Sequence, residues 1–120
     1  MEDNKKEQIE ALEVLAEFNE RLVNNMKIVV KELSGSRLDD TDKFLKSIID
    51  AINWEIQVVN GTLSVLNEGK ERLNKDEFNA EVVALSKAIN KNNDAEMAEE
   101  FEKIIPMFEQ LGISAKEVIA

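Results

Sequence analysis

Hydrophobic residues recur at intervals of three and four along most of the chain. This spacing places them on one face of an α-helix. The pattern is interrupted only at short polar segments that contain glycine or asparagine. It predicts four helices, at about residues 3–34, 40–68, 75–91 and 94–111, followed by a short C-terminal turn. Because the connections are short, we expect an all-α, antiparallel up-down helical bundle in one domain, residues 1–120.

The second predicted helix contains the most hydrophobic stretch of the chain, residues 44–66. One seam along this helix has heptad-like spacing and is expected to face the core: Leu45, Ile49, Ile52, Ile56, Val59, Leu63 and Leu66. The only tryptophan, Trp54, points away from the seam, and with Val58 it makes more than half of the circumference hydrophobic. A helix of this kind is buried from several sides or contributes to an interface.

The Trp54 side of this helix has two explanations. Either Trp54 and Val58 contact a third helix of the same bundle, or they form a groove or a dimer face. Tryptophan is favoured in interfaces because it buries a large area with few rotatable bonds. The residues predicted to anchor a partner on such a face are Phe44, Ala51, Trp54, Val58 and Val65.

Residues that begin and end helices support these boundaries. Gly35 is placed to terminate the first helix. Asn74 with Glu77, and Asn93 with Glu96, have the spacing of N-terminal caps for the third and fourth helices.

The end of the fourth helix follows from two residues that disfavour helices. Pro106 should kink or divide the helix because proline has no backbone N–H. Gly112 is expected to end it, and Ser114 with Glu117 then has the spacing to cap a last short turn.

Two residues inside the predicted helices do not match their surroundings. Asn19 lies within the hydrophobic face of the first helix and needs a hydrogen-bond partner if it is buried. Gly61 either loosens the second helix or allows another backbone to approach closely.

The composition disfavours most catalytic chemistry. The 120 residues include no cysteine and no histidine. The chain therefore has no thiolate nucleophile or disulfide, and it lacks the usual general base and the commonest zinc ligand. An enzyme that used carboxylates would need acids such as Glu99, Glu102 or Asp50 to converge, and these lie on polar faces. We expect no enzyme activity, no cofactor and no metal site.

The charge of the chain is acidic throughout. Fifteen basic and 25 acidic residues give a net charge of −10, without a basic cluster. Nucleic acids and anionic membranes are therefore disfavoured as partners, and mimicry of nucleic acid would need more clustered charge. The first ten residues are charged and no long apolar run follows, so we expect neither a signal peptide nor a membrane span. The expected location is the cytoplasm.

The sequence also resembles a known group of proteins. The segment NKNNDAEMAEEFEKIIPMFEQL, with INWEI upstream, is similar to small all-helical proteins of unknown function from Gram-positive bacteria. These proteins pair a helix that carries one tryptophan with a later acidic helix that contains a proline. The matching residues are Trp54, Asp94, Glu102, Ile104 and Pro106. The resemblance implies a helical fold and no particular activity.

These observations favour an uncharacterised, non-enzymatic protein-interaction module. An adaptor, chaperone or regulator would bind an amphipathic segment of a partner on the Trp54 face. The alternative is a homodimeric structural or assembly protein that uses the same face. A Trp54 fully buried within a monomer would exclude the first hypothesis. The sequence indicates no small-molecule substrate.

Overall fold

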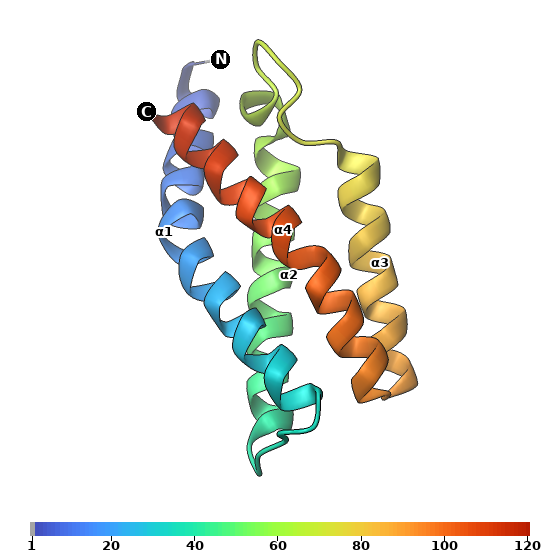
Figure 1. Ribbon diagram of the computed structural model, residues 1–120. Coiled ribbons are helices and arrows are strands. Elements are labelled where there is room, and N and C mark those ends of the chain that lie inside the picture. Colours follow the sequence, from blue (N-terminus) through green and yellow to red (C-terminus); the bar gives the residue numbers. More distant parts are fainter. Residues whose placement is uncertain (1) are drawn as a thin grey trace.

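The computed structural model describes residues 2–120, so Met1, which the single-domain prediction included, lies outside the described part. The chain forms four helices: α1 (Glu2–Leu33), α2 (Thr41–Leu66), α3 (Lys75–Lys91) and α4 (Asp94–Ile119). Successive helices run in opposite directions (Figure 1). The predicted all-α, antiparallel bundle of four helices is therefore confirmed.

Helix α4 packs against all three other helices. It crosses the front of the molecule diagonally in Figure 1, from α3 near its beginning to α1 near its end. The contact between α1 and α4 is the most extensive one, and α1 also packs on α2. Helix α3 packs on α4, and within residues 2–120 its backbone approaches neither α1 nor α2 closely. The core between α3 and α4 includes Phe78 and Phe108, whose rings are tilted by 43° to each other with their centroids 5.5 Å apart.

The predicted helix boundaries at three connections are confirmed. Gly35 follows α1 with a φ of +118°, a conformation that residues with side chains rarely adopt. The side chain of Asn74 accepts a hydrogen bond from the backbone N–H of Glu77 at 3.1 Å. Asn93 accepts one from the N–H of Glu96, also at 3.1 Å. Each asparagine thereby satisfies a backbone donor at the start of its helix.

The predicted end of the fourth helix at residue 111 is wrong, because α4 continues to Ile119. Pro106 lies inside the helix without dividing it. Its side chain is exposed, so water can reach the carbonyl group that the missing N–H leaves free. Phe108 and Leu111, just beyond the proline, are fully buried. Because these two side chains are buried against the other helices, the chain stays helical beyond Pro106.

Gly112 and Ser114 are also interior positions of α4, and no separate C-terminal turn follows them. A Cβ atom at Gly112 would lie only 3.0 Å from Cγ of Asn19 on α1. This glycine therefore allows α1 and α4 to approach closely. Ser114 is buried and accepts a hydrogen bond from Nε2 of Gln110 at 3.4 Å. It does not cap a helix.

The buried seam of α2 differs from the predicted one by a shift around the helix. Ile49, Ile56 and Leu63 are only half-buried. The buried positions with heptad spacing are Leu45, Ile48, Ile52, Glu55, Val59, Thr62 and Leu66. Two of these are polar, and each has a partner: Thr62 donates to the carbonyl of Val58 at 2.7 Å, and Glu55 accepts from Asn19. Helix α2 is hydrophobic enough that both seams fit a core, so partners on the other helices decide between them.

Candidate functional site

A surface groove between α1 and α2 contains Trp54, and we refer to it as the Trp54 groove. Its lining residues come from the first three turns of α1 and from the second half of α2: Asn4, Glu7, Gln8, Ala11, Trp54, Gln57, Val58, Gly61 and Thr62. The side chains of Ala11, Trp54 and Val58 make its surface partly hydrophobic, while amide side chains line much of the rest. The groove is open to solvent along its length.

The Trp54 side chain contacts Phe18 within the bundle and is partly exposed to solvent. Its indole ring packs edge-on against Phe18 of α1, with ring centroids 5.7 Å apart and an interplanar angle of 73°. This is the favoured T-shaped arrangement of aromatic rings. The side chain nevertheless remains 37% exposed. The contact within the bundle is therefore made to α1, and it leaves part of the ring available at the surface.

The structure brings together only some of the predicted anchor residues. Trp54 and Val58 line the groove one turn apart. Phe44 and Ala51 are half-buried on α2 and do not line it. Val65 is only 5% exposed and belongs to the core, beside Ile9 of α1. Val65 is therefore covered by the bundle itself and presents almost no surface to a partner.

Gly61 widens the groove. No atom lies within 4 Å of the place where its Cβ would be. Within the described part of the bundle, therefore, no other backbone approaches this glycine closely. Its missing side chain leaves open space between α1 and α2 at the level of Val58. The α1 residues of the lining were not predicted, since a single sequence does not reveal which part of α1 lies beside Trp54.

A hydrogen bond and an ion pair join α1 and α2 beside the groove. Ser64 on α2 donates to the side-chain oxygen of Gln8 on α1 at 3.1 Å. One turn further along, the Lys5 ammonium lies 3.0 Å from the Glu68 carboxylate. Both contacts connect the beginning of α1 to the end of α2 at the surface.

A buried carboxyl group lies directly behind the groove. Glu55 follows Trp54 in sequence and is 0% exposed. Its Oε1 accepts a hydrogen bond from Nδ2 of Asn19 at 3.0 Å, and the same nitrogen donates to the carbonyl of Phe108 at 3.1 Å. One carboxyl group and one amide thus connect α1, α2 and α4. The expectation that a buried Asn19 needs a partner is confirmed.

The environment of Glu55 favours its neutral form. Burial raises the pKa of Glu55 to about 7, and the hydrogen bond from Asn19 opposes this effect. Its second oxygen, Oε2, has no hydrogen-bond partner among the described residues. Glu55 was not singled out in the sequence. A signal was present, because Glu55 lies three residues after Ile52 and four before Val59, at a seam position.

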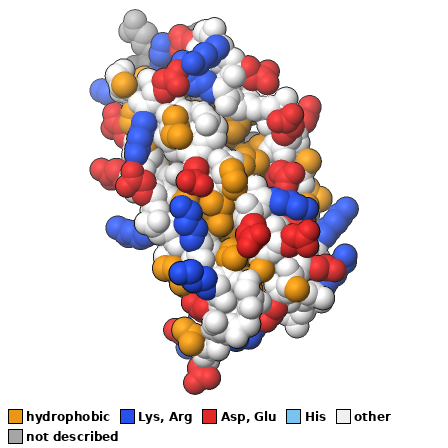
Figure 2. Space-filling view, viewed as in Figure 1, with side chains coloured by type: hydrophobic (Ala, Val, Ile, Leu, Met, Phe, Trp, Pro, Cys, Tyr) orange, Lys and Arg blue, Asp and Glu red, His pale blue; other side chains and the backbone are white. Residues whose placement is uncertain are grey.

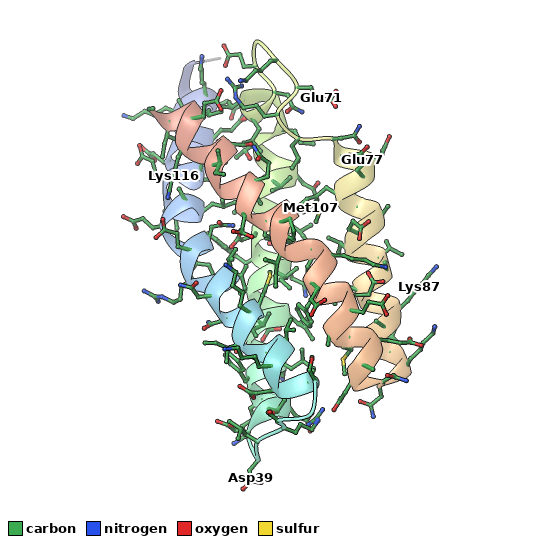
Figure 3. All side chains as sticks on the ribbon, in the orientation of Figure 1. Asp39, Glu71, Glu77, Lys87, Met107 and Lys116 are labelled. Atoms are coloured by element: carbon green, nitrogen blue, oxygen red, sulfur yellow. The ribbon has the colours of Figure 1, made fainter. Side chains whose placement is uncertain are left out.

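A second surface hollow lies between α1 and α4, on another side of the molecule. This hollow is bordered by two ion pairs: Lys116 with Glu20 at 2.6 Å, and Lys27 with Glu109 at 3.9 Å. Figure 3 shows Lys116 on the C-terminal part of α4, on the side next to α1. In Figure 2 acidic and basic side chains are interspersed over this face, with hydrophobic side chains between them. Such paired surface charges do not create a strong field.

The acidic residues that a carboxylate-based enzyme would use lie at the surface in the part of the chain that is described. Glu99, Glu102 and Asp50 are exposed. Within residues 2–120, no group of three or more acidic side chains is arranged to hold a metal ion. No helix in this range has both the length and the apolar character needed to cross a membrane.

Comparison with known proteins places the chain in a family. A family model described as a domain of unknown function (DUF8042) matches residues 10–113. The match spans most of the chain, so the chain belongs to this family. It includes Asn19, Trp54, Glu55 and Gly112. Comparisons with curated proteins and with solved structures give no significant match.

Proposed function

We propose that this member of the DUF8042 family is a non-enzymatic protein-interaction module that binds an amphipathic segment of a partner in the Trp54 groove. An adaptor, a chaperone or a regulator would use such a groove. The observation that carries the proposal is the partly exposed Trp54 at a groove between two antiparallel helices. Peptide helices commonly insert a hydrophobic face into grooves of this kind.

The lining of the groove suggests the chemistry of the partner. Ala11, Val58 and Gly61 would contact small or aliphatic side chains, and Trp54 would contact a larger one. Among the lining residues that the structure describes, Glu7 is the only charged one, and the chain as a whole has a net charge of −10. A segment with a hydrophobic face flanked by lysine or arginine would therefore match both the shape and the charge of the site.

The proposal is tested by filling the groove without disturbing the core. Gly61→Gln adds a side chain where no atom lies within 4 Å of the new Cβ. The matched control is Val83→Gln on α3, because Val83 is 51% exposed and far from the groove lining. Both variants should fold as the wild type does, as measured by circular dichroism. Binding partners are then captured from an extract with all three proteins.

We expect a specific partner to be retained by the wild type and by Val83→Gln, and lost with Gly61→Gln. A purified segment of that partner should change the fluorescence of Trp54, and the affinity should be at least tenfold lower for Gly61→Gln. Equal binding by the two variants would contradict the proposal, because it would place the partner elsewhere on the surface.

The alternative is a homodimer that uses the Trp54 face. Val14 favours it, because this exposed residue lies one turn from Phe18 on α1 and extends the hydrophobic surface beside Trp54. Light scattering after size exclusion at two protein concentrations distinguishes the cases. A mass of two chains that falls to one chain with Trp54→Ala supports the dimer. A mass of one chain at both concentrations excludes it.

Three further expectations from the sequence stay predictions. They are the cytoplasmic location, the Gram-positive bacterial origin, and the absence of nucleic-acid and small-molecule partners.

A further inference from the structure

We propose that the carboxyl group of Glu55 acts as a proton-operated switch for the Trp54 groove. With the proton bound, α1 and α2 pack as described above. Loss of the proton shifts the contact between Trp54 and Phe18 and so changes the shape of the groove. The use of this switch to regulate a partner rests on the proposed function, whereas the switch itself requires no partner.

The geometry connects the carboxyl group to the groove through neighbouring residues. Trp54 and Glu55 are consecutive on α2, and Phe18 and Asn19 are consecutive on α1. The aromatic contact between Trp54 and Phe18 therefore lies next to the 3.0 Å hydrogen bond between Asn19 and Glu55. Because a helix backbone moves as a unit, a change in the spacing at one contact alters the other.

The surroundings of Glu55 leave an ionised carboxylate poorly satisfied. A carboxylate can accept about four hydrogen bonds, but Glu55 receives one, and its Oε2 has none from the described residues. A buried charge without a partner is costly. The ionised group must therefore gain water or another donor, which requires α1, α2 or α4 to move.

No countercharge on the packed helices offsets this cost. Helix α1 presents Asn19 to the carboxyl group, and α4 contributes the Phe108 carbonyl through that same amide. Four charged residues of α1 and α4 on the same side of the bundle are paired with one another at the surface, as Lys116–Glu20 and Lys27–Glu109. Glu17 and Arg21, two residues either side of Asn19 on α1, are exposed. On α2 itself, the residues one turn before and one turn after Glu55 on the same face are hydrophobic: Ala51, Ile52, Val58 and Val59. Burial and the Asn19 hydrogen bond alone set the pKa of Glu55, which is about 7.

The composition makes this group unusual in the chain. There is no histidine and no cysteine, so no other side chain has an ordinary pKa near neutrality. A transition near pH 7 that is present in the wild type and absent in Glu55→Gln can therefore be assigned to Glu55. Glu55→Gln provides the test, since its amide stays neutral at every pH.

The single tryptophan reports the switch directly. We measure the emission of Trp54 from pH 5 to 9 for the wild type, for Glu55→Gln and for the control Glu20→Gln. Glu20 is exposed and follows Asn19 on α1. We expect a one-proton transition with a midpoint near pH 7 in the wild type and in Glu20→Gln, and a flat profile in Glu55→Gln. A flat wild-type profile, or the same transition in Glu55→Gln, would overturn the proposal.

A second measurement covers the case in which Glu55→Gln does not fold. Carbon NMR of the side-chain carboxyl groups of the wild type should then show one glutamate that titrates near pH 7. Titration of every glutamate near its ordinary pKa would overturn the switch. Both experiments use the protein alone. Failure to find a partner would contradict the proposed function but would not change the result of either titration. A flat titration would contradict the switch but would leave the proposed binding in the groove untouched.

Discussion

Two glycines in helices have opposite surroundings, and they predict opposite effects of an added methyl group. In Gly112→Ala the new Cβ would overlap Oδ1 of Asn19, a side chain that two hydrogen bonds hold in place. We expect the free energy of unfolding to fall by about 1 to 3 kcal/mol, as for other overpacked cores. In Gly61→Ala the Cβ meets no atom within 4 Å, and we expect a gain of up to about 1 kcal/mol.

Urea denaturation of both variants under the same conditions measures this difference. Equal stabilisation by the two alanines would mean that Asn19 does not lie against α4 at Gly112.

Glu55 predicts how stability depends on pH. The folded chain has a pKa of about 7 at Glu55, against an ordinary value of 4.5. Between these values the folded chain keeps a proton that the unfolded chain has lost. This contribution is therefore fully present below pH 4.5 and disappears as the pH rises through 7. The gap between the two values corresponds to about 3 kcal/mol.

Glu55→Gln should remove this dependence. The stability of the variant minus that of the wild type should be larger at pH 8 than at pH 5 by about 2.5 kcal/mol, because at pH 5 a part of the wild-type contribution is already lost. Urea unfolding at the two pH values, with Glu20→Gln as the control, provides the measurement. A constant difference between wild type and Glu55→Gln would show that the carboxyl group is solvated in the native state.

At the scale of the helix, α4 contains a proline that local preferences disfavour. Pro106→Ala should restore the backbone hydrogen bond to the carbonyl of Glu102. Because Pro106 is exposed, the change leaves the core intact. We expect stability to rise by about 1 to 3 kcal/mol, which thermal or urea unfolding measures. A loss of stability would instead mean that the proline fixes the path of α4 across α1 and α3.

The same helix shows what the sequence predicts well and what it does not. The starts of α3 and α4 were predictable because Asn74 and Asn93 act on backbone groups three residues away. The end of α4 was not, because Gly112 interrupts a helix by local preference but lies against Asn19 of α1 in the folded chain. Such a contact joins residues 93 positions apart, and the local pattern around residue 112 carries no sign of it.

The candidate site was predictable to a similar extent. Trp54 and Val58 could be assigned to a surface because they lie off the hydrophobic seam of α2. Val65 was assigned to the same surface, although the bundle covers it. Glu55 was missed because a hydrophobic alternative seam on α2 accounts for the same pattern. The α1 residues of the lining, such as Gln8 and Ala11, depend on how α1 and α2 are aligned. The sequence of either helix alone does not determine that alignment.

At the scale of the whole molecule, α3 is the least supported helix. Among the described residues it packs on α4 alone, while α4 also packs on α1 and α2. Regions with fewer tertiary contacts open at lower free energy. Native-state hydrogen exchange should therefore show lower protection for the amides of α3 than for the central turns of α1. Equal protection would mean that the four helices unfold as one unit.

The extensive contact between α1 and α4 also has a consequence for synthesis of the protein. Residues 94–119 leave the ribosome after the first three helices, so α1 and α2 must wait for their main covering helix. During that interval we expect Glu55 to be in contact with water and its pKa to be near the ordinary value. Refolding rates of the wild type and Glu55→Gln across pH would reveal whether docking of α4 takes up a proton. We expect that it does, so that the nascent hairpin carries a charge within its hydrophobic face until the last helix covers it.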